Sequence, residues 1–85
     1  MKKITIYSSL ICPYCIAAKK ILINEGLNFN EIIIDDKPDL KEEMIKRAHG
    51  KYTVPQIFFD DESIGGFDQL SILKKKQSIK SLVED

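Results

Sequence analysis

The chain has 85 residues, a length that suits one domain with a small core, so we expect residues 1–85 to form a single compact unit. Its 13 basic and 13 acidic residues give a formal net charge of +0, which provides no electrostatic reason to expect nucleic acid or a membrane as a partner. No apolar run is long enough to cross a bilayer, and the residues after Met1 are unlike a secretory signal. We therefore expect a cytoplasmic monomer.

The first half of the sequence predicts a strand, a helix, a strand and a helix in that order. Residues 3–7 alternate and are rich in β-branched side chains, as in a strand. Apolar residues recur at helical spacing from Pro13, which suits a first helical position, and Gly26 suits the end of that helix. Residues 29–35 then predict a second strand, and helical spacing returns over residues 38–50.

The second half predicts a hairpin followed by a helix. Residues 56–60 and 63–66 are short strand candidates joined by an acidic turn, which indicates an antiparallel pair. A helix is predicted from near Asp68, a residue type that favours the N-cap, and the apolar tail around Ile79 and Val83 would form a further helix or fray. This order predicts an α/β fold with a mixed sheet of four strands, a parallel first pair and three to four flanking helices.

The only two cysteines lie in the segment Cys12-Pro13-Tyr14-Cys15, at the start of the first predicted helix. This spacing places one thiol at the N-cap and the other about one turn into the helix, on one face and within reach of a disulfide bond. The unpaired N–H groups and the positive end of the helix favour the thiolate at Cys12, while Cys15 should be less exposed. A mixed disulfide must be attacked by a second sulfur, so we predict Cys12 as the nucleophile and Cys15 as the resolving thiol.

Three other roles for the cysteine pair are weaker. A permanent disulfide would close so short a loop that it would contribute little stability. A tetrahedral zinc site needs four ligands, and only His49 is available to join the two sulfurs, so we expect no metal site. A cysteine-protease pair of Cys12 and His49 is disfavoured because His49 lies in a loop-like segment, where a solvated surface residue is expected.

Three motifs together make the sequence resemble the glutaredoxins, the dithiol members of the thioredoxin superfold, over nearly the whole chain. They are CPYC at residues 12–15, TVPQIF at residues 53–58 and GGFD at residues 65–68. The resemblance implies a thioredoxin-like fold and a glutathione-dependent thiol-disulfide oxidoreductase that reduces glutathione mixed disulfides and protein disulfides. It also implies glutathione as co-substrate, no tightly bound cofactor, and disulfide-containing or glutathionylated proteins as partners.

The same resemblance implies where glutathione binds. The bond before Pro55 would be cis, the backbone of Val54 would pair with the cysteinyl residue of glutathione, and the start of the last helix would hold the γ-glutamyl group. The implied binding residues are Tyr14, Thr53, Val54, Pro55, Phe67 and Asp68.

The sequence departs from this pattern at two places. Many glutaredoxins carry a lysine shortly before the first cysteine, where it binds the glycine carboxylate of glutathione, but this chain reads Ser8-Ser9-Leu10-Ile11. Lys41 and Lys51 are the candidates to supply that cation. Gln69 stands where relatives often carry an acidic residue or a hydroxyl group. We therefore expect competent but weaker glutathione binding.

Two alternative functions use the same residues. Two copies of the chain could share a [2Fe–2S] cluster through Cys12 and two glutathione molecules, because thiolates are natural ligands of such clusters. Pro13 stiffens the loop and disfavours this function, because the relatives known for cluster binding tend to carry Gly or Ser at that position. A redox-inert binding module that uses the same groove is the other alternative.

Overall fold

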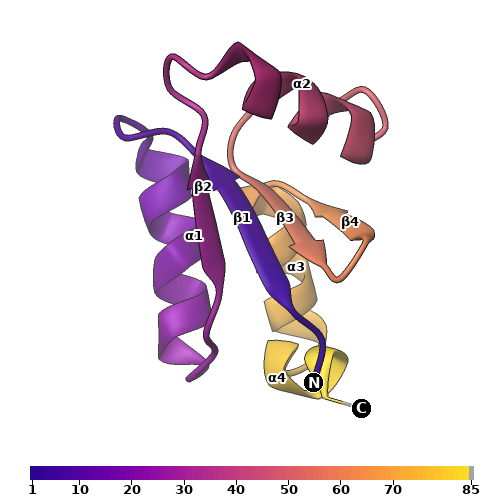
Figure 1. Ribbon diagram of the computed structural model, residues 1–85. Helices are drawn as coiled ribbons and strands as arrows, with labels where there is room; N and C mark the ends of the chain where they lie inside the picture. Colours follow the sequence, from indigo (N-terminus) through magenta and orange to yellow (C-terminus); the bar gives the residue numbers. More distant parts are fainter. Residues whose placement is uncertain (85) are drawn as a thin grey trace.

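A computed structural model describes residues 1–84 of the chain. Within these residues the chain forms one four-stranded sheet and four helices (Figure 1). In chain order the elements are β1 (Ile4–Ser8), α1 (Pro13–Asn24), β2 (Asn30–Ile33), α2 (Pro38–Arg47), β3 (Gln56–Phe59), β4 (Glu62–Gly65), α3 (Phe67–Lys76) and α4 (Ile79–Val83). No helix within residues 1–84 is long and apolar enough to cross a membrane.

The sheet has the strand order β2-β1-β3-β4 and is mixed, as predicted. β1 and β2 run parallel, whereas β1 with β3 and β3 with β4 are antiparallel. Parallel neighbours need a crossover, which α1 provides between β1 and β2. The carboxyl end of β1 therefore leads directly into the segment with the two cysteines.

One face of the sheet is covered by α1, α3 and α4 (Figure 1). Side chains alternate along a strand, so Ile4 and Ile6 of β1 point to this face together with Ile57 and Phe59 of β3. They pack against buried apolar residues of the three helices: Ala18, Leu22, Leu70, Ile79 and Val83. This core fixes α1, and hence the cysteines at its start, against the sheet.

The opposite face is covered by α2, whose Met44 packs against Tyr7 and Phe58 together with Ala48, the C-cap residue of this helix. The rings of Tyr7 and Phe58 meet edge to face, with centroids 5.5 Å apart. The Tyr7 hydroxyl donates to Glu43 Oε2 at 2.7 Å and accepts a hydrogen bond from Arg47 Nη1 at 2.8 Å. These contacts attach α2 to the sheet and thereby place the loop that follows α2.

The end of α1 agrees with the sequence analysis. Gly26, with φ of 72°, follows the helix, and its N–H donates to the Ile23 carbonyl at 2.9 Å. The next N–H, of Leu27, donates to the Leu22 carbonyl at 3.0 Å, which completes a Schellman motif. Glycine reaches this left-handed conformation without the steric cost that a side chain would add.

The prediction of Asp68 as an N-cap is wrong. The N-cap of α3 is Gly66, and Asp68 lies in the first turn of the helix. The side chain of Gln69 explains the difference, because its Oε1 accepts a hydrogen bond from the Gly66 N–H at 2.8 Å. Gln69 therefore provides the side-chain contact at the helix start, and the Asp68 carboxylate has no capping role.

The tail forms a helix, so the alternative that it frays is wrong. Ile79 and Val83 of α4 are fully buried. The Lys2 N–H donates to the Val83 carbonyl at 2.6 Å, which joins α4 to the segment before β1. The predicted strand limits lie within two residues of the observed ones, and the predicted start of β3 at Gln56 agrees with the structure.

Candidate active site

Cys12 is the N-cap of α1, as predicted. Its backbone is extended, Pro13 follows at the first helical position, and the Cys15 N–H donates to Cys12 Sγ at 3.2 Å. On its other side, Cys12 Sγ lies 3.8 Å from the carbonyl oxygen of Val54. The sulfur of Cys12 is thus held between the end of the helix and the loop that precedes β3.

Cys15 lies one turn further along α1 and is fully buried, whereas Cys12 retains 9% exposure. Burial raises the pKa of the Cys15 thiol to about 12, and a hydrogen bond with Cys12 contributes to this rise. Both cysteines are free thiols in the structure. At neutral pH Cys15 is therefore protonated and Cys12 is the thiol that an approaching molecule meets.

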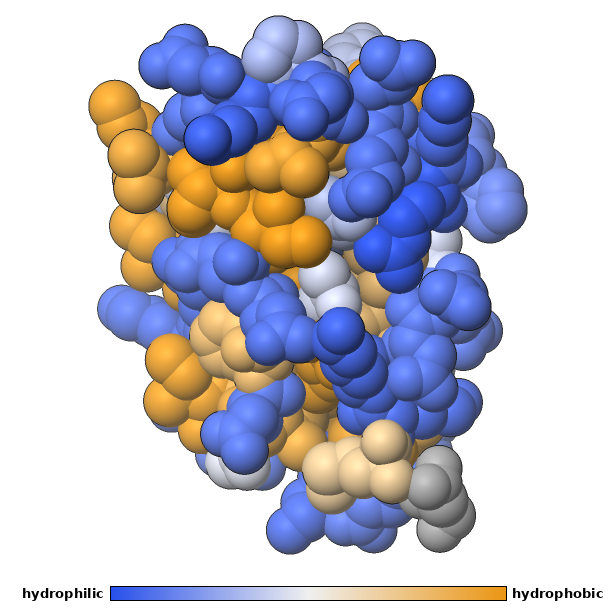
Figure 2. Space-filling model, in the orientation of Figure 1, coloured by the Kyte–Doolittle hydropathy of each residue, from blue (hydrophilic) through white to orange (hydrophobic). Residues whose placement is uncertain are grey.

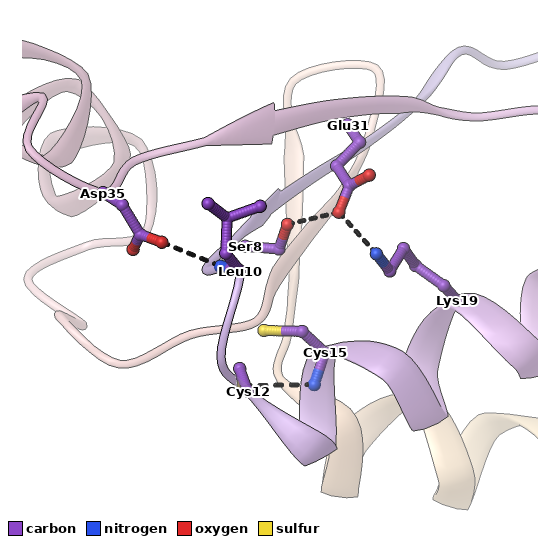
Figure 3. A network of polar contacts seen from close by, with 7 residues as sticks. All are labelled: Ser8, Leu10, Cys12, Cys15, Lys19, Glu31 and Asp35. Atoms are coloured by element: carbon purple, nitrogen blue, oxygen red, sulfur yellow. Dashed lines mark hydrogen bonds and ion pairs between the residues drawn. The ribbon is translucent and has the colours of Figure 1, made fainter.

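A polar network joins the end of β1 and the middle of α1 to β2 (Figure 3). Glu31 Oε2 accepts hydrogen bonds from the Ser8 hydroxyl and from Lys19 Nζ, each at 2.6 Å. These two contacts hold the pKa of Glu31 below its ordinary value, with the Lys19 contact contributing most. The Lys19 ammonium group also acts to lower the pKa of Cys15, against the larger effect of burial.

A groove of about 480 Å³ lies beside Cys12. All six residues that the sequence analysis assigned to glutathione binding line it: Tyr14, Thr53, Val54, Pro55, Phe67 and Asp68. The bond between Val54 and Pro55 is cis, as the resemblance implied. The rings of Tyr14 and Phe67 lie with their centroids 5.8 Å apart. The groove thus receives residues from three separate segments, which only the fold brings together.

The groove contains one candidate cation. Lys51 lines it, whereas Lys41, the other candidate, is exposed on α2 and does not line it. Lys51 and Asp68 give the groove one basic and one acidic side chain.

Three lining residues, Gln56, Gly66 and Gln69, were not among the predicted site residues. Gln56 and Gly66 belong to the TVPQIF and GGFD motifs, so the motifs themselves contained the signal for these two. Gln69, which follows GGFD, was noted as a departure from the family pattern, but its contact with Gly66 could not be read from sequence.

The residues considered for metal binding do not come together. His49 is exposed at the end of α2, at φ of 56°, and is not among the lining residues of the groove within the described chain. Residues 1–84 contain no group of three or more His, Cys, Asp or Glu side chains that could hold a metal ion.

Comparison with known proteins identifies the family. Residues 4–64 match the sequence model of the glutaredoxin family. The chain is 43% identical over 84 residues to glutaredoxin 3 of Escherichia coli strain K12, covering 99% of this chain and 100% of that one. It is 40% identical over 83 residues to a glutaredoxin of Pseudomonas aeruginosa, covering 98% of both.

The fold agrees with the sequence comparisons. The solution structure of a glutaredoxin from Brucella melitensis superposes with a TM-score of 0.83 at 40% identity, covering 98% of this chain and 89% of that one. Both the predicted thioredoxin-like fold and the resemblance drawn from the three motifs are therefore confirmed. The chain belongs to the glutaredoxin family and is a thiol oxidoreductase of the glutaredoxin type.

Proposed function

We propose that this chain reduces glutathione mixed disulfides and protein disulfides, with glutathione as the electron source and Cys12 as the nucleophile. The observation that carries the proposal is the position of Cys12. Its sulfur accepts the Cys15 N–H at 3.2 Å and adjoins the groove at Val54, while Cys15 is buried behind it. Only Cys12 combines partial exposure with a helix end that stabilises a thiolate.

Reduction of a glutathione mixed disulfide needs Cys12 alone. The Cys12 thiolate attacks the glutathione sulfur and the substrate disulfide bond breaks, so the electron pair leaves on the substrate sulfur, which takes up a proton. A second glutathione thiolate then attacks the Cys12–glutathione bond. Oxidised glutathione leaves and the Cys12 thiolate is restored.

Reduction of a protein disulfide needs both cysteines. The Cys12 thiolate attacks one sulfur of the protein disulfide, whose bond breaks, and the other protein sulfur leaves and takes up a proton. The Cys15 thiolate then attacks the Cys12 sulfur, so the protein leaves with both thiols reduced and the Cys12–Cys15 bond forms. Two glutathione molecules reduce that bond and leave as oxidised glutathione. Cys15 must lose its proton for its attack, and its pKa of about 12 makes the thiolate scarce in the reduced resting state.

The charges of the groove suit glutathione, a peptide that carries two carboxylates and one ammonium group. Lys51 would bind the glycine carboxylate of glutathione, and Asp68 would bind the amino group. The N–H groups in the first turn of α3, at Phe67 and Asp68, have no intrahelical acceptors and would bind the γ-glutamyl carboxylate. The Val54 backbone would pair with the cysteinyl residue.

A glutaredoxin of known structure supports glutathione as the ligand. A complex with glutathione has been solved for a buckwheat glutaredoxin that shares this fold, with a TM-score of 0.85 at 22% identity and covering 96% of this chain and 76% of that one. The fold itself can therefore hold the tripeptide. We place the activity in the cytoplasm, where thiols stay reduced, and assign it to a monomer.

The proposal is tested by turnover of a small glutathione mixed disulfide with glutathione, using glutathione reductase to follow oxidised glutathione. Wild type and Cys15→Ser should both turn over, whereas Cys12→Ser should fall to the background rate. With a protein disulfide as substrate, Cys15→Ser should lose activity as well. Turnover by Cys12→Ser, or an inactive wild type, would contradict the proposal.

A further inference from the structure

The loop that carries Cys12 has little apolar contact to hold it. Leu10 is 72% exposed and Ile11 is 92% exposed, and Figure 2 shows hydrophobic surface along the edge of the molecule where this loop lies. Exposed side chains contribute no burial energy that would fix a loop. Polar contacts must therefore determine where the loop places the residue that follows it, Cys12.

Asp35 supplies these contacts from the segment that follows β2, beside the end of β1. Its Oδ1 accepts a hydrogen bond from the Ser9 hydroxyl at 2.6 Å. Its Oδ2 accepts one from the Leu10 N–H at 2.8 Å (Figure 3). The Ile34 N–H donates to the Ser8 carbonyl at 3.0 Å, which continues the pairing past the end of β2. This backbone contact brings Asp35 beside the loop.

The two hydrogen bonds keep Asp35 ionised and hold it in one orientation. They lower the pKa of the Asp35 carboxyl, with the contact from Ser9 contributing most. Both donors are uncharged, and the segment Ser8-Ser9-Leu10-Ile11 contains no basic residue. A carboxylate that accepts a hydrogen bond on each oxygen restrains the direction of its two donors as well as their distance.

The restrained residues lie directly before the nucleophile. Leu10 is two residues from Cys12, whose sulfur must stay 3.2 Å from the Cys15 N–H for the helix end to stabilise the thiolate. A loop that moves would take the N-cap residue with it. We propose that Asp35 is a positioning residue that fixes the loop over residues 9–11 and thereby holds the Cys12 sulfur at the start of α1.

This inference rests on the proposed role of Cys12, but it can be tested without glutathione. In a Cys15→Ser background Cys12 is the only thiol, so its reaction with iodoacetamide at neutral pH measures its reactivity alone. We expect Asp35→Ala to slow this reaction about tenfold, less than the roughly hundredfold that a 1 Å displacement of a reacting group can cost. Ser9→Ala, which leaves the Leu10 contact and the charge of Asp35 intact, should slow it by a smaller factor.

The charge of Asp35 is separated from its positioning role by two further variants. Asp35→Asn keeps an oxygen that can accept one of the two hydrogen bonds, so it should restore part of the rate lost in Asp35→Ala. A purely electrostatic role predicts a rate above that of the parent protein, because removing a negative charge favours a nearby thiolate. Asp36→Asn removes the same charge from the exposed neighbouring residue, where asparagine tolerates the φ of 56°, and should leave the rate unchanged.

Amide hydrogen exchange provides a structural readout of the same variants. The amides of Leu10 and of position 15 should exchange faster in Asp35→Ala, because the first loses its acceptor and the second loses the sulfur that accepts its N–H. Thermal unfolding identifies any variant that fails to fold, in which case Ser9→Ala decides. Alkylation rates within about twofold of the parent in both Asp35→Ala and Ser9→Ala would overturn the proposal, since a restraint on a reacting group is expected to affect its rate more. The role of Cys12 in the proposed function would still stand.

Discussion

The two thiols differ because of where one helical turn places them. Cys12, at the N-cap, lies beside Val54 and keeps a small exposed surface, whereas Cys15 has none. Burial penalises the charged form of a thiol, so the pKa of Cys15 is raised. This difference allows one cysteine to react first and the other to follow.

The raised pKa of Cys15 predicts a loss of stability in alkaline solution. An unfolded chain loses the Cys15 proton near the ordinary value of 9.0, whereas the folded chain keeps it until about 12. Between these values the unfolded state binds fewer protons, so the free energy of unfolding falls as the pH rises. Urea unfolding of reduced wild type should show this fall, by up to about 2 kcal/mol between about pH 8 and about pH 10.5.

Cys15→Ser is the matched variant for this measurement, because serine does not titrate in the same range. Its stability should fall less over the same interval, with the remaining loss due to other groups such as Tyr7, whose pKa is also raised by burial. Equal losses in the two proteins would show that Cys15 titrates normally when folded.

Lys51 is the residue that we expect to replace the lysine missing before Cys12. Lys51→Gln should raise KM for glutathione about fivefold with little change in kcat, the size expected for one exposed ion pair with a ligand carboxylate. Lys41→Gln, which removes the same charge from an exposed residue outside the groove, is the control and should leave KM unchanged. Equal KM values for wild type and Lys51→Gln would remove Lys51 from the binding site.

At the scale of elements, α1 is attached to β2 by one ion pair close to the active site. Lys19 and Glu31 are 2.6 Å apart, and their side chains are 26% and 29% exposed. A second ion pair, between Glu42 and Lys46 on α2, is longer at 3.7 Å and far more exposed, at 71% and 77%. The two pairs therefore form a natural comparison of partly buried and exposed charges.

Glu31→Gln should lower the free energy of unfolding by about 1 kcal/mol at neutral pH, whereas Glu42→Gln should change it by a few tenths of a kcal/mol at most. Because the pKa of Glu31 is lowered in the folded protein, its contribution is present above the ordinary glutamate value and is lost as the pH falls through the lowered value. The gap between wild type and Glu31→Gln in urea unfolding should therefore close in acid. A gap that persists would assign the effect to packing instead.

The elements themselves were largely predictable, because their patterns are local. The alternation in residues 3–7, the helical spacing after Pro13 and the glycine at position 26 each depend on neighbours in sequence. The start of α3 was not predictable, because Gly66, Asp68 and Gln69 are all suitable for a helix start and only the structure shows which group contacts which. Asp35 was missed for a related reason, since its contact with Ser9 spans 26 residues.

On the scale of the whole molecule, the sheet separates two cores that support different parts of the site. The core with α1 holds the cysteines, and the core with α2 holds the loop that contains Lys51, Thr53 and Val54. Only the assembled fold brings these segments to one groove, so the groove residues are predictable from the sequence through resemblance alone. The cis bond before Pro55 was likewise implied by resemblance and not by spacing.

A substitution in the C-terminal helix shows whether the stability of the fold and the reactivity of Cys12 can be changed separately. Val83 is fully buried in the core that holds α1, but it lies in α4, outside the groove lining. Val83→Ala should lower the free energy of unfolding by about 2 kcal/mol, the cost of a buried cavity, while the alkylation rate of Cys12 stays unchanged. Val83→Ile, which enlarges the same side chain slightly, is a second variant for the same comparison of stability with the alkylation rate. A slowed alkylation in folded Val83→Ala would mean that the active site depends on this distant core.

The central claim is that Cys12, and not Cys15, exchanges with glutathione. The most direct measurement is the rate at which oxidised glutathione modifies each single-cysteine variant, followed by mass spectrometry. The structure predicts rapid formation of a glutathione adduct on Cys15→Ser and very slow formation on Cys12→Ser, where the remaining thiol is fully buried and protonated. An adduct that forms equally fast on Cys12→Ser would contradict the assignment of the nucleophile.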